Sequence, residues 1–97
     1  MANFRIEYSR RASAELKDLR KSDQARIVDK IRRHVRTDPE RVTGSVIKKL
    51  DPPVIAEYRL RIGDYRAFYN VYRDEQVVVI AAIRYKGRKT LDEAAHD

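Results

Sequence analysis

The sequence has 97 residues, 42% of them hydrophobic, and this length supports one domain with a single small core. The 22 Lys and Arg residues outnumber the 15 Asp and Glu residues, which gives a formal net charge of +7. This charge indicates a polyanionic partner such as nucleic acid, an acidic protein or an anionic membrane surface, although it also serves solubility. We therefore expect residues 1–97 to form one domain.

Several kinds of site are excluded by composition. The chain has no cysteine, so it forms neither disulfides nor a thiolate metal site. Its two histidines, His34 and His96, are too far apart to form a metal-binding pair of the HxxxH type, and we expect no metal and no cofactor. The longest apolar block, Val77 to Ile83, is too short to cross a bilayer, and the N-terminus lacks the apolar run of a signal peptide. The expectation is a cytoplasmic protein without a membrane partner.

The first residues predict a strand followed by a helix. Asn3 to Tyr8 alternates apolar and polar residues, which is the two-residue period of a half-buried strand. Ser9 then offers a side-chain oxygen to the free amides of a helix start. From Arg10 to about Lys21, apolar residues recur at spacings of four and three, at Ala12, Leu16 and Leu19.

A second amphipathic helix should follow directly. Ser22 or Asp23 can cap its start, and it should end near Arg36 because Pro39 disfavours a helical residue before it. The same spacing places its apolar residues at Ile27, Val28, Ile31 and Val35. Two helices joined by a few residues are expected to pack as an antiparallel hairpin.

The second half of the chain predicts strands. Residues 46–50 suit a short edge strand, and residues 54–62, 65–73 and 76–85 suit three antiparallel strands. Gly63 and Asp64 form a two-residue hairpin turn, since glycine reaches positive φ without strain. The predicted fold is α+β: an N-terminal strand, a two-helix hairpin and a three-stranded antiparallel meander, with the helices on one face of the sheet.

The two hairpins set which residues share a face. The turn at Gly63 places Arg61 opposite Arg66. For the second hairpin, a two-residue loop would mix Arg84 into the apolar face, so we favour a three-residue loop, "DEQ". That loop pairs Arg66 with Arg84, and it pairs Val71 with Val79, Tyr69 with Ala81, Ala67 with Ile83 and Tyr65 with Tyr85.

The resulting arginine row comprises Arg59, Arg61, Arg66 and Arg84, with Phe68 and Tyr72 on the same face. Guanidinium groups bind phosphate oxygens in a bidentate fork, and an aromatic ring beside them can stack on a base. The alternative is an ordinary solvated sheet face, on which Glu57, Asp64 or a C-terminal carboxylate neutralises the row.

The chain closely resembles the RelE/ParE superfamily of bacterial toxins from toxin-antitoxin pairs. The resemblance covers nearly the whole sequence, with "KKLDPP" leading to "YRLRIGDYRAFYNV" and then "VVVIAAIR". Its most specific part, "YRLRIGDYRAFY", is similar to the superfamily's YRxRxGdYRxxY hairpin, whereas "AxxxLxxL" in the first helix is generic. The resemblance implies a RelE-like, microbial ribonuclease-type fold.

The RelE-like branch of this superfamily cuts messenger RNA in the ribosomal decoding site without a metal, by helping a 2′-hydroxyl attack the adjacent phosphate. Transferred by position, the catalytic candidates are Arg61, Arg66, Arg84 and Lys86, and the nucleic-acid-binding candidates are Arg59, Phe68, Tyr85, Arg88 and Lys89. The family's "HR" after the last strand is replaced here by Tyr85 and Lys86, and no later tyrosine follows. Proton removal would therefore fall to Tyr85, Lys86 or Glu57.

Two other activities stay open. The ParE-like branch inhibits DNA gyrase by binding and needs no catalytic group, and a third reading is a basic module that contacts operator DNA only through an antitoxin. The resemblance implies a cognate antitoxin, with the ribosome and mRNA as further partners in the RelE-like case. The antitoxin is expected on the basic sheet face and beside the helices, near residues that the spacing assigns mainly to the core: Leu16, Leu19, Ile27 and Ile31.

Overall fold

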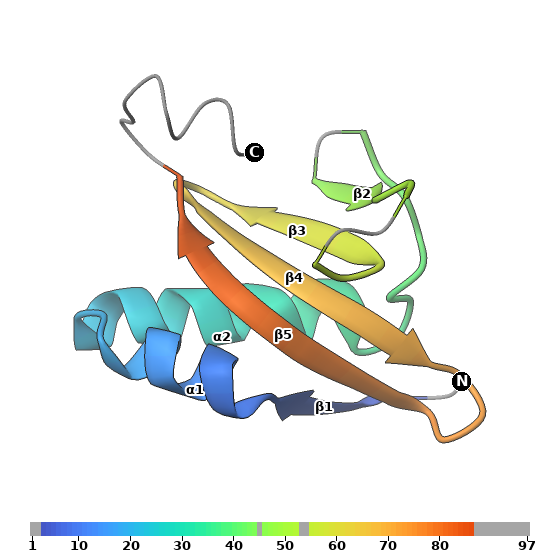
Figure 1. Cartoon of the computed structure of the whole chain (residues 1–97), viewed down its shortest axis with the longest axis horizontal. Coiled ribbons are helices and arrows are strands. Elements are labelled where there is room, and N and C mark those ends of the chain that lie inside the picture. Colours follow the sequence, from blue (N-terminus) through green and yellow to red (C-terminus); the bar gives the residue numbers. More distant parts are fainter. Residues whose placement is uncertain (1–2, 45, 53–54, 87–97) are drawn as a thin grey trace.

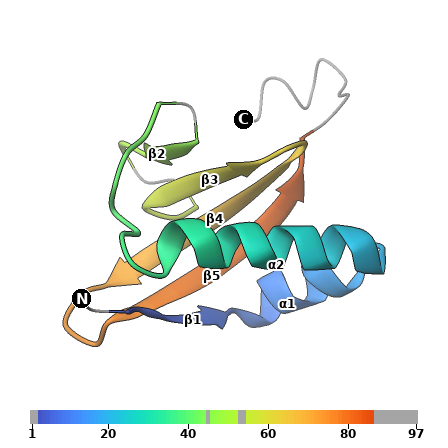
Figure 2. The ribbon, with the colours of Figure 1, turned by 180° about the vertical axis from the view of Figure 1, so that it is seen from behind.

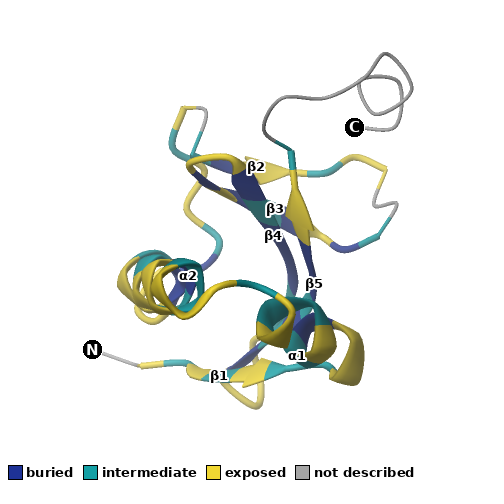
Figure 3. Ribbon diagram, turned by 90° about the vertical axis from the view of Figure 1, so that its left-hand side faces the viewer, coloured by how far each residue is buried: buried dark blue, intermediate teal, exposed yellow. Residues whose placement is uncertain are grey.

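The computed structural model describes residues 3–44, 46–52 and 55–86. Two helices lie on one face of a five-stranded sheet, so the predicted α+β class is confirmed (Figures 1 and 3). The elements in chain order are β1 (Arg5–Tyr8), α1 (Arg10–Lys17), α2 (Lys21–Val35), β2 (Ile47–Lys49), β3 (Tyr58–Ile62), β4 (Tyr65–Tyr72) and β5 (Val77–Tyr85). Neither helix of this described part is long and apolar enough to cross a membrane.

The strand order in the sheet is β1-β5-β4-β3-β2. The predicted antiparallel meander of β3, β4 and β5 is confirmed, and β2 is the predicted edge strand. The N-terminal strand β1 runs parallel to β5, so the first and last strands of the described chain are neighbours (Figure 1). Such a parallel pair requires a crossover, and the two helices and the strands between β1 and β5 provide it.

The helix boundaries differ from the predicted ones. Ser9 caps α1 as expected, since its Oγ accepts the N–H of Ala12 at 3.0 Å. However, α1 ends at Lys17, four residues early, and α2 begins at Lys21 with Arg20 in the N-cap position and no side-chain cap. The prediction that Ser22 or Asp23 caps α2 is wrong. The Asp23 carboxylate lies in the first turn and accepts a hydrogen bond from the Tyr65 hydroxyl at 3.2 Å.

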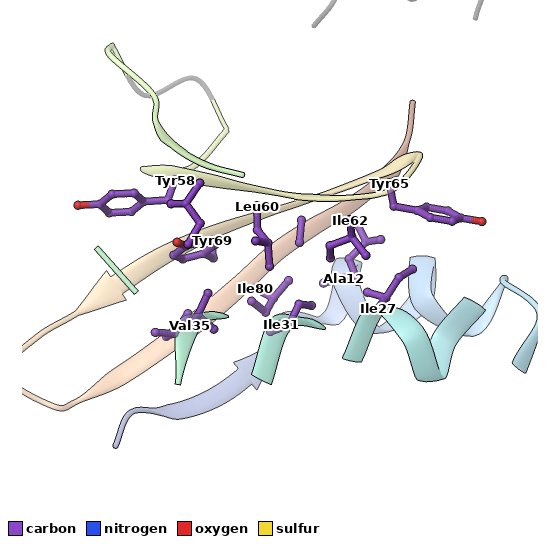
Figure 4. Close-up of a cluster of buried hydrophobic side chains, with 14 residues drawn as sticks. Ala12, Ile27, Ile31, Val35, Tyr58, Leu60, Ile62, Tyr65, Tyr69 and Ile80 are labelled. Atoms are coloured by element: carbon purple, nitrogen blue, oxygen red, sulfur yellow. The ribbon is translucent and has the colours of Figure 1, made fainter. Parts of the chain in front are cut away.

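The main core lies between α2 and the inner face of the sheet. Ile27, Ile31 and Val35 of α2 are fully buried and point toward Leu60 and Ile80 of the sheet (Figure 4). Viewed from behind, α2 crosses in front of the strands, with α1 beside it at lower right (Figure 2). The apolar residues that the helical spacing predicted for the core, Ile27, Ile31 and Val35, therefore form the buried side of α2.

Side chains of α1 and of its N-cap residue complete the edge of β5. Strand β1 pairs with β5 only as far as Ile80, which leaves later β5 backbone groups without a strand neighbour on that side. The Ser9 hydroxyl donates to the Ala81 carbonyl at 2.9 Å, and Glu15 Oε1 accepts the N–H of Ile83 at 2.8 Å. Helix α1 thus satisfies backbone groups that a further strand would otherwise pair.

The predicted register is correct in the first hairpin and half correct in the second. Arg61 pairs with Arg66, and Arg66 with Arg84, as predicted. Beyond Phe68 the ladder shifts by one residue, because a bulge leaves Ala81 without a partner in β4. The loop is therefore four residues long, residues 73–76, and the predicted pairs of Val71 with Val79 and Tyr69 with Ala81 are wrong. Val78 and Ile80 take those places and are fully buried.

Replacing Glu15 with alanine should lower the free energy of unfolding by about 1–3 kcal/mol, because the Ile83 amide loses its acceptor. Glu15→Gln keeps a side-chain oxygen and should retain most of that stability, although it loses the exposed ion pair with Arg11. Urea unfolding of both variants measures the difference. Equal stability of the alanine and glutamine variants would contradict a role for this hydrogen bond.

Candidate nucleic-acid interface

Alternation along β3 separates the arginines from the core. Tyr58, Leu60 and Ile62 are buried against the helices, so Arg59 and Arg61 project from the opposite, outer face of the sheet. Strand β4 continues the pattern, since Tyr65 and Ala67 are in the core and Arg66 is not. Along β3 and the first residues of β4, the sheet therefore has an apolar inner face and a cationic outer face, as the sequence predicts.

The cross-strand pairs bring the predicted row together. Arg66 of β4 has Arg61 of β3 on one side and Arg84 of β5 on the other, while Arg59 is opposite Phe68. Directly paired residues have Cβ atoms about 4.5–5.5 Å apart, so these long side chains reach a common volume. Within the described residues, no carboxylate forms an ion pair with Arg61, Arg66 or Arg84.

Arg66 is held by the backbone of the turn. Its Nη1 donates to the carbonyls of Gly63 and Tyr65, at 3.1 and 3.0 Å, while its Nε is buried and finds no hydrogen-bond partner in the described chain. Burial, followed by the charges of Arg59 and Arg61, lowers the pKa of Arg66, and Asp64 offsets part of this. Arginine stays protonated at neutral pH even so. The row is a group of positive charges that repel one another.

Phe68 lies on the predicted face but is not an open platform for a base. Its side chain is only 8% exposed, because it packs with Ala56 and Ala82 in a small second core on the outer face. The Arg84 guanidinium carbon lies 6.0 Å from the Phe68 ring centroid. The expectation of an accessible ring at Phe68 is therefore wrong, and this ring supports Arg84. Tyr72, which is 48% exposed, is an accessible aromatic residue of this face.

Glu57 and Asn70 tie the segment before β3 to β4, a contact that the sequence analysis missed. Asn70 Oδ1 accepts the N–H of Glu57 at 2.9 Å, and Glu57 Oε1 accepts the N–H of Val71 at 3.0 Å. The Leu50 N–H also donates to the Glu57 carbonyl at 2.8 Å. Glu57, a candidate proton acceptor in the sequence, thus has its carboxylate in a backbone hydrogen bond beside the second core.

The candidates after β5 lie in different places. Tyr85 is opposite Tyr65 and contacts the edge of its ring, with centroids 5.3 Å apart, so it belongs to the inner side of the sheet and away from the row. The backbone N–H of Lys86 donates to the Asp64 carbonyl at 2.5 Å, which places Lys86 beside the turn that positions Arg66. Arg88 and Lys89 lie outside the described residues.

The geometry suits an oxyanion better than a metal ion. Guanidinium groups from three adjacent strands present N–H donors to one side of the sheet, and phosphate oxygens accept such donors in pairs. In residues 3–44, 46–52 and 55–86, no group of three or more His, Cys, Asp or Glu side chains could hold a metal ion. The site can bind a phosphate and stabilise negative charge that develops on it.

Comparison with protein families gives one match that covers most of the chain. Residues 6–90 match the model of the ParE toxin of the type II toxin-antitoxin system parDE. No curated protein sequence matches the chain closely enough to count as a relative.

Three solved structures are similar to the fold. The archaeal RelE-RelB complex of Pyrococcus horikoshii matches at 25% identity and a TM-score of 0.71, over 90% of this chain and 99% of that one. The RelBE2 toxin-antitoxin complex of Mycobacterium tuberculosis matches at 21% identity and a TM-score of 0.71, over 87% and 99% of the two chains. The intact RelBE complex of E. coli matches at 21% identity and a TM-score of 0.54, over 91% and 100%.

The match to the family model covers far more than half of the sequence, and the α+β architecture agrees with it. The protein therefore belongs to the ParE toxin family within the RelE/ParE superfamily, and it is the toxin of a type II toxin-antitoxin system.

Proposed function

We propose that this toxin is a metal-independent endoribonuclease that cuts messenger RNA on the ribosome and so inhibits translation in the cytoplasm. The observation that carries the proposal is the row of Arg61, Arg66 and Arg84 on three adjacent strands, without an ion-paired carboxylate in the described chain. Attack of a 2′-hydroxyl on the neighbouring phosphate concentrates negative charge on the phosphate oxygens. Fixed cations stabilise that charge more than they stabilise the bound substrate.

The three arginines would have different tasks. Arg66 is fixed by two backbone carbonyls and would hold the scissile phosphate in place. Arg61 and Arg84 would contact the same phosphate from the neighbouring strands, with the Phe68 ring supporting Arg84. Lys86 stays a candidate for proton transfer because its backbone is tied to the same turn. Proton removal by a guanidinium is not part of the proposal, since arginine stays charged.

A cognate antitoxin is the partner of a type II toxin, and we propose that it covers the arginine face. The three similar structures are described as toxin-antitoxin complexes. An acidic segment would be attracted to a face where several cations have no ion-paired acid. Contact with operator DNA would then come only through the antitoxin.

Inhibition of DNA gyrase by binding is the second candidate. The description of the matching family model, ParE toxin, favours this ParE-like activity. Such an activity needs a complementary surface and no proton transfer, and the arginine face would then bind gyrase or its DNA. The two candidates differ in whether the phosphate held at Arg66 is cleaved.

Replacing Arg61 with glutamine should raise the free energy of unfolding by a few tenths to about 1 kcal/mol at low salt, because like charges directly opposite each other destabilise a strand pair. The difference should shrink between about 0.05 M and about 0.5 M salt as screening increases. Urea unfolding at both salt concentrations measures it. Arg5→Gln is the matched control, since Arg5 is exposed and paired with Glu7. A loss of stability in Arg61→Gln at low salt would contradict mutual repulsion in the row.

Replacing Arg66 with alanine should lower mRNA cleavage by about a hundredfold or more, as loss of one transition-state donor does in other enzymes. Its unfolding free energy should change by less than about 1 kcal/mol, because relief of repulsion from Arg61 and Arg84 offsets the loss of its hydrogen bonds to the Gly63 and Tyr65 carbonyls. Primer extension in a cell-free translation reaction reports the cuts, and circular dichroism reports the fold. Arg5→Ala serves as the control that removes a cation away from the row.

A parallel gyrase supercoiling assay separates the two candidates. Codon-positioned cuts that need ribosomes support the endoribonuclease. Blocked supercoiling without RNA cuts supports the gyrase inhibitor instead. A folded Arg66→Ala variant that cuts mRNA as fast as the parent protein would rule out the phosphate role of Arg66.

A further inference from the structure

A pocket at the C-terminal end of α2 has a lining unrelated to the arginine row. It has a volume of about 350 Å³, within the range of ligand pockets, and Ile47 of β2 forms part of its wall. The polar groups around it are two guanidiniums, one imidazole, two hydroxyls and one carboxylate, from Arg33, Arg41, His34, Thr37, Thr43 and Asp38. We propose that this pocket is a second phosphate-binding site.

The fold holds the walls of the pocket in place. Ile31 and Val35 anchor the end of α2 in the core, which directs Arg33 and His34 away from the buried side of the helix. The following loop is fixed where the Tyr69 hydroxyl donates to the Pro39 carbonyl at 2.6 Å. The Thr43 N–H donates to the Ile47 carbonyl at 3.3 Å and ties the far wall to β2. The backbone that carries the donors is therefore held in place, which reduces the entropy cost of binding.

The local charge favours an anion. Asp38 is the one carboxylate among the lining residues, and Arg41 has no ion pair with any residue of the described chain. Arg33 pairs with Asp29 through Nε at 3.1 Å, which leaves its terminal nitrogens for a ligand. Lys30 and Arg33 of α2 are the charged groups that act on His34, and Asp38 and Arg41 of the loop line the same pocket. Burial, then Lys30 and Arg33, lowers the pKa of His34.

The donor set distinguishes phosphate from other anions. A phosphate group offers three or more acceptor oxygens in a tetrahedral arrangement, whereas a carboxylate offers two in a plane. The two guanidiniums and the two hydroxyls of Thr37 and Thr43 can donate to this larger number of acceptor oxygens. The phosphate could belong to a nucleic-acid backbone or to a small phosphorylated ligand, and both use the same contacts.

This site is independent of cleavage at the arginine row. Helix α2 covers the inner face of the sheet, and the row projects from the outer face, so no residue is shared. Phosphate binding in this pocket can therefore be tested whether or not the protein is a ribonuclease.

Histidine NMR tests the proposal on the intact chain. The protein has two histidines, so the ring signals of His34 can be followed with those of His96 as an internal control. Inorganic phosphate should raise the pKa of His34 by about one unit relative to chloride at equal ionic strength, because a nearby anion stabilises the imidazolium. The pKa of His96 should not show the same phosphate-dependent rise as that of His34. Equal shifts of both histidines, or none at His34, would overturn the site.

Arg41→Ala should remove the phosphate-dependent shift of His34, while Arg5→Ala should keep it. Arg41 is exposed and has no ion pair among the described residues, so its loss should leave the fold intact, which the amide spectrum checks. A full shift in a folded Arg41→Ala variant would contradict binding in this pocket.

Titration in the Arg66→Ala background separates the two sources of phosphate. A single-stranded RNA oligonucleotide that shifts His34 at a concentration about tenfold or more below that of adenosine monophosphate would indicate a nucleic-acid backbone. If adenosine monophosphate shifts the His34 signals at the same concentration as the RNA or at a lower one, the ligand would be a small phosphorylated molecule. Failure of both, together with failure of inorganic phosphate, would refute the site even if the protein cuts mRNA.

Discussion

The register of the β3–β4 hairpin is the constraint on which the other features depend. A two-residue turn sets it, with Gly63 at a φ of 58°, a conformation that glycine adopts without the strain of a Cβ. A slip of one residue would turn Arg59 and Arg61 into the core and Leu60 to solvent. Burial of unpaired guanidiniums costs several kcal/mol, so the slipped pairing is excluded energetically. The turn therefore fixes both the apolar face that folds the protein and the cationic face that we assign to function.

The two faces of this hairpin act on stability in opposite directions. The inner face buries Leu60, Ile62 and Tyr69 almost completely against α2, which is the main favourable contribution. The outer face places arginines opposite each other, and burial together with neighbouring charge lowers the pKa of both Arg59 and Arg66. Arg66 is oriented by backbone carbonyls, which accept its hydrogen bonds without cancelling its charge. This is the arrangement expected of a site that keeps its charge for a ligand.

Local rules predicted the features that depend on neighbouring residues. The Ser9 cap, the apolar side of α2 and the Arg61–Arg66 pair follow from spacing and turn chemistry. Features that depend on contacts across the chain were missed. The bulge at Ala81 lies in the apolar run "VVVIAAI". All residues of this run are apolar, so the sequence does not show which of them face the core and where the alternation shifts. The burial of Phe68 results from the segment before β3, whose prolines predict a loop but not where it packs.

Guanidinium groups alone constrain how an endoribonuclease of this kind could work. They hold a phosphate and stabilise its developing charge, but they accept no proton at neutral pH, and Tyr85 lies on the other side of the sheet. The nucleophile is the RNA's own 2′-hydroxyl, which reacts only when it is in line with the leaving oxygen. Free RNA samples that geometry rarely, so a partner that holds the RNA in line lowers the barrier. A toxin that uses the arginine row for cleavage would therefore cut mRNA efficiently only where a partner such as the ribosome holds the mRNA in that conformation.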